Sequence, residues 1–593
     1  MNAMLKSFAA CGMVVLVLLA GLPAAAQNDL GANALRLIEA VKDQDRAAVR
    51  SLLEQKAAEK ADVNAAQADG ATALHWAAYR EDIETADLLI RAGADVNAAN
   101  DYGLTPLSMA CSTRNAAMVE KLLDAGANPN LAPWSGVTPL MTAANTGSAD
   151  VAALLLARGA DGNAAEPRRG QTALMWAIAA GHPDIARLLI EHGANVSARS
   201  HQYQEENFSP MVLEGYSADV PATPQGGFTP LLFAARVGDL ETARLLVSKG
   251  ADLNESTPEE GNSLVVATAA GHEDIALFLL EQGADPNAAD AGGITPLHYA
   301  MRDGLKVLHG YDISGAQRLC QSGAGARCLV VEDEAMLSDP RYKTFELTPP
   351  EEEKVLPGRN MLNLAKALLA RGAAPNAQLA IPPPQMRLAK KPVVNLTGAT
   401  PFFLATASGD LPSMRVLVEA RAKPLVGTVI SEKEFLKDGH GDDNQIQGNA
   451  TPLMVAIGMG RQDDFSTAAE AKALEAAETL VGLGADVNEA TETGWTPLHA
   501  ASFLGANSLI EFLVARGADP NVKNGCGQTP LSLAEATDAR GLLQRVTPHP
   551  ATAKLLRSLG AGSGPVSGPV GRCVEGRFGL DYAVKPATGP TSE

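Results

Sequence analysis

Residues 93–107 read GADVNAANDYGLTPL, and the two motifs in this stretch, GADVN and GLTPL, decide the fold. Both motifs return along the chain, and Thr72, Thr105 and Thr138 follow one another at intervals of 33 residues. Thr-Pro-Leu or a close variant occurs eleven times, beginning at Thr72, Thr105, Thr138, Thr172, Thr229, Ser263, Thr295, Thr400, Thr451, Thr496 and Thr529. A fixed period of this size is typical of a solenoid, in which each repeat stacks on its neighbours because it cannot bury its apolar face alone.

The residue types of the repeat have physical roles in a pair of short helices. A threonine hydroxyl accepts a hydrogen bond from a free backbone N–H at the start of a helix, and proline fits the next position because no helical bond is needed there. Leucine and small alanines bury a narrow face, so that two helices pack closely. Glycine ends the second helix in a left-handed conformation, and Asp or Asn with Gly builds the turn into the next repeat. The repeat therefore predicts an all-α fold.

The composition narrows the class of protein. The chain has 593 residues, of which 46% are hydrophobic and 4% aromatic, and its formal net charge is −20. The acidic balance argues against a nucleic-acid binder, which needs basic patches. The apolar content argues against a wholly disordered chain. Length alone suggests about four domains, but the repeats indicate one long array instead.

The sequence resembles the ankyrin-repeat family over roughly residues 31–560. The 33-residue period, the complete Thr-Pro-Leu-His at residues 295–298 and 496–499, and Gly-Ala-Asp-Pro-Asn at residues 517–521 carry the resemblance. It implies a solenoid of helix-turn-helix repeats with β-hairpin fingers. About eleven motif-bearing repeats follow a degenerate N-terminal one. The resemblance is specific for the fold and nearly silent on function.

The N-terminus has the pattern of an export signal. Lys6 supplies a positive charge, an apolar run extends over residues 9–22, and three alanines at residues 24–26 form a cleavage site before Gln27. This pattern predicts a cleaved signal peptide at residues 1–26. The apolar run is short for a transmembrane helix. We therefore expect an exported monomer, periplasmic or secreted, with no stable membrane span after cleavage.

Behind the signal peptide we expect three segments. Residues 27–66 form a degenerate capping repeat, residues 67–560 the ankyrin-repeat array and residues 561–593 a flexible Gly/Pro-rich tail. Insertions break the rhythm of the array at residues 198–226, 305–359, 378–397, 424–448 and 461–471. Long loops in compact domains are often functional, but loops also accept insertions at low cost, and both interpretations stay open.

The cysteines indicate disulfides rather than a metal site. Past the signal peptide five cysteines remain, and neither C-x-x-C nor C-x-x-C-H occurs, which excludes zinc-ribbon and c-type haem sites. In an exported protein the candidate disulfides are Cys320–Cys328 and Cys526–Cys573. Cys111 falls in a helical pattern, where we expect a small buried residue.

The resemblance also implies where a partner binds. Ankyrin-repeat proteins contact partners through the finger tips and the concave face of the first helices. The matching positions in the repeats of this chain give ten candidate partner-binding residues, which are Tyr79, Arg80, Tyr102, Trp134, Arg168, Phe228, Arg236, Arg302, Trp495 and Phe503. Trp, Tyr and Arg are enriched at interaction hot spots, although packing is the alternative role for each residue.

The motifs of common enzymes are missing from the sequence. It contains no G-x-S-x-G, H-E-x-x-H or P-loop motif, and the histidines of Thr-Pro-Leu-His are expected to make structural hydrogen bonds. We predict a non-catalytic protein–protein interaction scaffold that binds an unknown protein partner and has no catalytic residue, cofactor or metal. Two alternatives stay open. One is an enzyme or metal-binding protein with a site in the 305–359 insertion, and the other is a secreted effector acting on a host protein.

Overall fold

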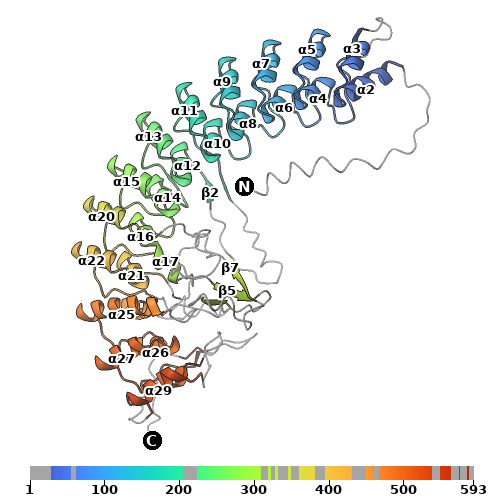
Figure 1. Cartoon of the computed structure of the whole chain (residues 1–593). Helices are drawn as coiled ribbons and strands as arrows, with labels where there is room; N and C mark the ends of the chain where they lie inside the picture. Colours follow the sequence, from blue (N-terminus) through green and yellow to red (C-terminus); the bar gives the residue numbers. More distant parts are fainter. Residues whose placement is uncertain are drawn as a thin grey trace. The chain divides into compact units, whose positions relative to one another are not determined.

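The computed structural model of the protein (Figure 1) describes residues 29–54, 62–204, 224–308, 318–321, 328–330, 345–348, 359–380, 394, 396–429, 449–459, 467–536, 548–562, 573–574 and 584–585. The chain divides into two compact units, Met1–Ala194 and Asn195–Glu593. The predicted signal peptide at residues 1–26 lies outside the described residues, as do most of the predicted insertions at 305–359, 378–397 and 424–448.

The first unit consists of helix pairs. Its helices are α2 (Asp29–Lys42), α3 (Arg46–Glu54), α4 (Ala73–Tyr79), α5 (Ile83–Arg91), α6 (Pro106–Ser112), α7 (Ala116–Asp124), α8 (Pro139–Thr146), α9 (Ala149–Ala157), α10 (Ala173–Ala179) and α11 (Pro183–Glu191). The two helices of a pair pack on each other, as α4 does on α5, and each first helix packs on the next, as α4 does on α6. Figure 1 shows the first and second helices of this unit as two parallel rows.

The second unit continues the same architecture. Its helices are α12 (Pro230–Val237), α13 (Leu240–Ser248), α14 (Ser263–Ala270), α15 (Glu273–Glu281), α16 (Pro296–Ala300), α17 (Arg302–Leu308), α20 (Leu362–Ala370), α21 (Pro401–Ala407), α22 (Leu411–Glu419), α24 (Pro452–Ala456), α25 (Thr467–Gly482), α26 (Pro497–Phe503), α27 (Asn507–Ala515), α28 (Pro530–Ala534) and α29 (Pro550–Ser558). Paired short helices that pack in chain order confirm the predicted helical solenoid.

The Thr-Pro-Leu motif begins the first helices as predicted. Thr105 Oγ1 accepts a hydrogen bond from the backbone N–H of Ser108 at 3.2 Å, and Pro106 occupies the first helical turn. Ser108 Oγ accepts from the Thr105 N–H at 2.8 Å, which completes a capping box. Leu107 and Ala110 are buried in the core between the repeats.

Three buried histidines join neighbouring repeats. The backbone N–H of Thr295 donates to Nδ1 of His298 at 3.2 Å, so this nitrogen carries no proton, and Nε2 donates to the Ala377 carbonyl oxygen at 3.1 Å. His75 and His499 make the equivalent bonds. Burial lowers the pKa of all three histidines, to about 4 for His298 and for His499. The prediction of structural hydrogen bonds is confirmed.

Asparagine side chains link consecutive turns at the ends of the second helices. Asn97 Nδ2 donates to the Gly126 carbonyl oxygen at 3.1 Å, and its Oδ1 accepts from the Asn128 N–H at 2.7 Å. The same pair of bonds recurs at Asn64, Asn130, Asn287, Asn376, Asn488 and Asn521. Asn287 reaches Gly372 across the 305–359 insertion, so the insertion leaves the register of the array unchanged.

Short strands form hairpins outside the helices. The strands are β1 (Gln202–Gln204), β2 (Pro224–Gly226), β3 (Ser256–Thr257), β4 (Gly261–Asn262), β5 (Arg318–Gln321), β6 (Cys328–Val330), β7 (Phe345–Thr348), β8 (Cys573–Val574) and β9 (Val584–Lys585). The antiparallel pairs β1–β2 and β3–β4 are fingers that precede first helices. Within the 305–359 insertion the strands form a three-stranded antiparallel sheet in the order β6-β5-β7, which the sequence did not predict.

Two insertions begin or end inside helices, unlike the loops that we expected. The last residues of the 461–471 insertion belong to α25, because the Ala- and Glu-rich sequence from Thr467 onward has high helix propensity. The first residues of the 305–359 insertion belong to α17, which follows α16 and packs against α21. A Cβ on Gly304 would lie only 1.9 Å from the Leu404 carbonyl oxygen, so this packing requires a glycine.

Candidate functional site

The finger tips of the first unit carry exposed aromatic and basic side chains. Trp134 is 81% exposed and Tyr102 is 56% exposed. Arg168, on the next finger, is exposed as well. These three predicted contact residues come from three consecutive fingers, and their side chains lie at the surface, where a partner can reach them.

Neighbouring fingers in this unit pack tightly against each other. A Cβ on Gly103 would lie 2.8 Å from Pro133 Cα and 3.1 Å from Trp134 N, and a Cβ on Gly136 would lie 2.0 Å from Pro167 Cδ. Both glycines also have positive φ angles, which side chains disfavour. The contacts make one continuous surface, which we call the finger row and define by Tyr102, Trp134 and Arg168.

Buried polar side chains fix the loops of the finger row. Asn100 Oδ1 accepts from the backbone N–H groups of Tyr102 and Leu104 at 3.0 and 2.9 Å. The Glu166 carboxylate, 6% exposed, accepts from the N–H of Arg168 at 2.8 Å and of Arg169 at 2.7 Å. Because the tips are already ordered, a partner that binds them loses little free energy in arranging these loops.

The backbone N–H of Arg168 is hydrogen-bonded to Glu166, whereas its guanidinium is available to a partner. Glu166 is occupied by backbone N–H groups, including that of Gln171 at 3.2 Å. Within the part of the chain that the structure describes, no acidic side chain lies in ion-pair distance of Arg168. The tip of this finger therefore presents a solvent-accessible positive charge.

Tyr79 and Arg80 lie at the end of α4 in the first unit. Both are exposed, Tyr79 by 53%. The Tyr79 ring packs edge-on against Trp76 with ring centroids 6.0 Å apart, and Lys42 Nζ lies 4.5 Å above the Trp76 ring. Packing therefore supports one edge of Tyr79, and the remaining surface is open to solvent.

In the second unit, two predicted residues, Phe228 and Arg236, lie together in the same repeat. The Arg236 guanidinium lies 4.1 Å from the centre of the Phe228 ring and forms an ion pair with Glu260. Phe228 is only 6% exposed, whereas Arg236 is half-buried. The Phe228 ring packs beneath Arg236 and against Phe233, so its burial favours the packing role that the sequence left open over the predicted partner contact.

A half-buried carboxylate that no sequence motif singled out, Asp290, lies near Glu260, the ion-pair partner of Arg236. Tyr299 Oη donates to Asp290 Oδ2 at 2.7 Å. Burial raises the pKa of Asp290, and the nearby charge of Glu260 raises it further. Burial also raises the pKa of Tyr299 well above its usual value, and the charges of Asp290 and Glu260 add to this rise. Asp290 is the acidic residue before a Gly-x-Thr-Pro-Leu motif, so its position in the repeat was the available signal.

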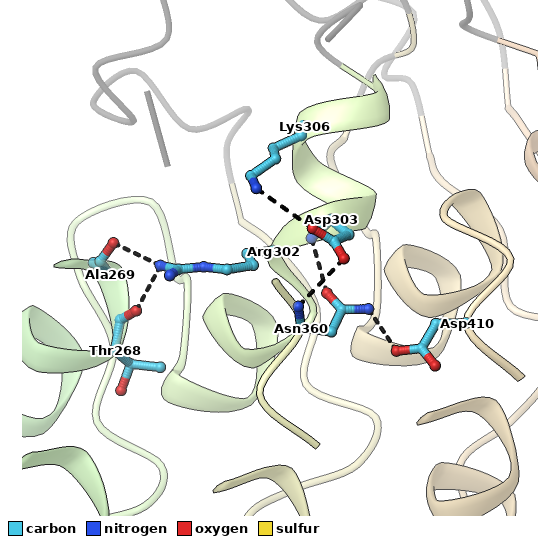
Figure 2. Close-up of polar contacts among 7 residues, drawn as sticks. All are labelled: Thr268, Ala269, Arg302, Asp303, Lys306, Asn360 and Asp410. Carbon is cyan, nitrogen blue, oxygen red and sulfur yellow. Dashed lines mark hydrogen bonds and ion pairs between the residues drawn. The ribbon is translucent and has the colours of Figure 1, made fainter. Parts of the chain in front are cut away.

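Arg302 is a structural residue, and its expected place on a partner-binding face is wrong. Its side chain is fully buried, and Nη2 donates to the carbonyl oxygens of Thr268 and Ala269, both at 2.9 Å (Figure 2). These carbonyls lie in the last turn of α14, where few backbone N–H donors remain for them. Desolvation lowers the pKa of Arg302 to about 10, so the side chain stays charged at neutral pH and caps the helix.

Beside Arg302, a polar cluster joins the two ends of the split repeat (Figure 2). The Asp303 N–H donates to Asn360 Oδ1 at 2.8 Å, and the Asn360 N–H donates back to Asp303 Oδ2 at 3.3 Å. Asn360 Nδ2 donates to Asp410 Oδ2 at 2.6 Å, and Lys306 Nζ lies 3.4 Å from Asp303 Oδ1. Because Asp303 precedes the insertion and Asn360 follows it, these bonds close the repeat across residues 309–358.

Trp495 and Phe503 form an aromatic cluster near the C-terminal end of the array. Their ring centroids are 6.1 Å apart, and the Trp495 and His499 rings are 6.0 Å apart. Trp495 is only 7% exposed, which favours packing over the predicted partner contact, whereas Phe503 is half-buried.

The structure bears on both predicted disulfides without testing either pairing. Cys526 is disulfide-bonded, and Cys111 is free and buried. The partner of Cys526 is therefore one of the cysteines whose side chains lie outside the described residues, among them Cys573. In the β5–β6 pair, Cys320 lies directly opposite Cys328. Opposite residues on antiparallel strands have the Cα separation that a disulfide needs. Both pairings stay predictions.

The described residues offer neither a metal site nor a membrane-spanning helix. They contain no group of three or more His, Cys, Asp or Glu side chains that could hold a metal ion. They also include no helix with the length and apolar character that crossing a bilayer requires. Glu332, Asp333 and Glu334, the carboxylates of the alternative site in the insertion, lie outside the described residues.

Comparison with known proteins identifies the family. A model of ankyrin repeats (three copies) matches residues 37–133, 130–200, 204–290, 231–324 and 465–544. These segments together cover more than half of the 593 residues, so the chain belongs to the ankyrin-repeat family. Ankyrin repeats are typically non-catalytic modules for protein–protein interaction, and their stacked repeats offer extended binding surfaces.

Similarity to curated relatives is local. The ankyrin repeat, SAM and basic leucine zipper domain-containing protein 1 of Nomascus leucogenys is 37% identical over 89 residues, which are 14% of this chain and 19% of the relative. The protein of the same description from Saimiri boliviensis boliviensis is 36% identical over 97 residues, or 16% of this chain and 20% of the relative. The chain thus matches about a fifth of the length of these relatives.

Proposed function

We propose that the protein is a non-catalytic scaffold that binds a protein partner through the finger row of its first unit. The observation that carries the proposal is the exposure of Tyr102, Trp134 and Arg168 on three fingers that pack into one ordered surface. Aromatic rings and arginine are the side chains that dominate interaction hot spots. Tyr79 and Arg80 extend the candidate surface to the end of α4.

We also propose that the protein works outside the cytoplasm, in the periplasm or as a secreted protein. The signal-peptide pattern at residues 1–26 supports this location. The disulfide at Cys526 supports it as well, because disulfides persist in oxidising compartments.

Capture of the partner tests the proposed function. The mature protein and the triple variant Tyr102→Ala, Trp134→Ala, Arg168→Ala are used as baits in extracts of the compartment to which the protein is exported. We expect the variant to lose most of the captured partner and to keep the thermal unfolding temperature of the wild type.

A matched control uses exposed residues on second helices of the same unit. Arg50→Ala, Arg91→Ala and Glu120→Ala lie on α3, α5 and α7 and should leave capture unchanged. Equal capture by the wild type and the finger-row variant would refute the proposed surface. A large drop in its unfolding temperature would also refute it, because the three residues would then be part of the core.

A further inference from the structure

The chemistry of the finger row changes from one finger to the next. Tyr102 and Trp134 present aromatic surface, and Arg168 follows on the next finger with a positive charge. The two aromatic side chains are among the most exposed large apolar groups of the described residues, and Trp134 is the most exposed of all. A ligand along this row therefore meets apolar contacts first and a cation last.

The local charge at Arg168 selects against a basic ligand. The chain as a whole has a net charge of −20. At physiological salt, however, charges more than about 8 Å apart are largely screened. At the tip, the Arg168 side chain is exposed, whereas the nearby Glu166 carboxylate is buried under three backbone N–H groups. Arginine binds carboxylates with two parallel hydrogen bonds.

The spacing of the fingers fits an extended peptide. Packed helices lie about 8–10 Å apart, and successive repeats place their fingers at a similar separation. A chain in the extended polyproline II conformation rises about 3.1 Å per residue and places every third side chain on the same face, so one finger corresponds to about three residues of the ligand. Side chains about three residues apart would therefore meet Tyr102, Trp134 and Arg168 in turn.

We propose that the finger row binds an extended segment of the partner in which an acidic residue follows or precedes apolar residues at a spacing of about three. The carboxylate pairs with Arg168, and the apolar side chains cover Trp134 and Tyr102. This inference rests on the proposed function and names the chemistry of its ligand.

Selection from a library of random dodecapeptides tests the inference. The mature protein, its Arg168→Glu variant and a charge-matched Arg50→Glu variant on α3 are each used as the target. With the wild type and Arg50→Glu we expect enrichment of peptides with Asp or Glu about three residues from an apolar residue. With Arg168→Glu the acidic preference should disappear and Lys or Arg should replace it. An enriched peptide should lose at least tenfold in affinity for Trp134→Ala.

Two results would overturn the inference. One is enrichment without any acidic preference, and the other is an unchanged preference with Arg168→Glu. If either result is found and the finger-row triple variant still loses the captured partner, only the proposed ligand chemistry is wrong. If capture is also unaffected, the proposed function fails with it. Unfolding temperatures equal to that of the wild type show that the variants are folded.

Discussion

Acidification from pH 7 to pH 5 should destabilise the array through its buried histidines. In His298 and His499, Nδ1 accepts a hydrogen bond from the backbone N–H of the capping threonine, so a proton on Nδ1 would displace that bond. Both rings are buried, and their pKa is about 4 compared with a usual 6.5. As the pH falls below 6.5, the unfolded chain takes up protons that the folded chain does not. Stability is therefore lost between pH 6.5 and pH 4.

The size of the effect follows from these pKa values. Each pKa unit corresponds to about 1.4 kcal/mol. At pH 5, about 1.5 units below the unfolded value, each histidine lowers the free energy of unfolding by about 2 kcal/mol. The two histidines together should lower it by about 4 kcal/mol, and the loss should level off near pH 4. His75, whose pKa burial also lowers, adds to the loss in the same direction.

Urea unfolding of the mature protein at pH 7 and pH 5 measures this loss. The variant His499→Gln should lose about 2 kcal/mol less than the wild type between the two pH values, because its side chain cannot titrate. His192→Gln is the matched control, since His192 is exposed, and it should retain the full loss. If the wild type and His499→Gln show the same dependence on pH, the account of the neutral buried histidines is wrong.

Three further predictions concern single residues of the array. Arg421 has a φ of 66° at a position where other repeats have glycine. Arg421→Gly should therefore raise the free energy of unfolding by about 0.5–1 kcal/mol, whereas Ala420→Gly at the neighbouring position should lower it. Equal effects of the two variants in urea unfolding would contradict this prediction. Gly304→Ala should cost about 3 kcal/mol or more because its Cβ would meet the Leu404 backbone, and Gly482→Ala, with open space around it, should be neutral or stabilising by thermal unfolding. Asn130→Ala should cost about 2 kcal/mol by removing the bonds to Gly159 and Asp161, and Asn130→Asp, which keeps the acceptor, should cost less; equal losses in urea unfolding would show that the acceptor bond contributes nothing.

The fold could be predicted from the sequence because one local motif specifies each repeat. The first helix is capped by Thr105, begins at Pro106 and places Leu107 in the core. Gly126 follows the second helix in a left-handed conformation. Each of these roles depends only on residues of the same repeat, so the 33-residue pattern is enough to predict it. The sheet formed by β5, β6 and β7 was missed because it lies outside the repeat pattern.

The candidate contact residues show what a repeat pattern cannot tell. Tyr79 and Arg302 occupy the same position, seven residues after the capping threonine, yet Tyr79 is 53% exposed and Arg302 is fully buried. The difference arises because the chain continues into α17 after Arg302, whereas α4 ends at Tyr79. The environment of this position therefore depends on the insertion and not on the motif.

Position within the finger explains the other outcomes. Phe228 and Trp495 directly precede the capping threonine, at the base of the finger, and both are buried. Trp134 and Arg168 lie four residues before it, at the tip, and both are exposed. The distance from the threonine thus separates packed side chains from accessible ones, a distinction that a search for aromatic and basic residue types did not make.

Site-specific photocrosslinking shows directly whether the finger row binds a protein partner. A photoreactive phenylalanine analogue replaces Trp134 in the full chain, and Arg91 on α5, exposed on a second helix, receives the same group as the control. We expect irradiation in the native compartment to join one partner to position 134 and to leave position 91 unlinked. A partner that crosslinks at position 91 and not at position 134 would contradict it.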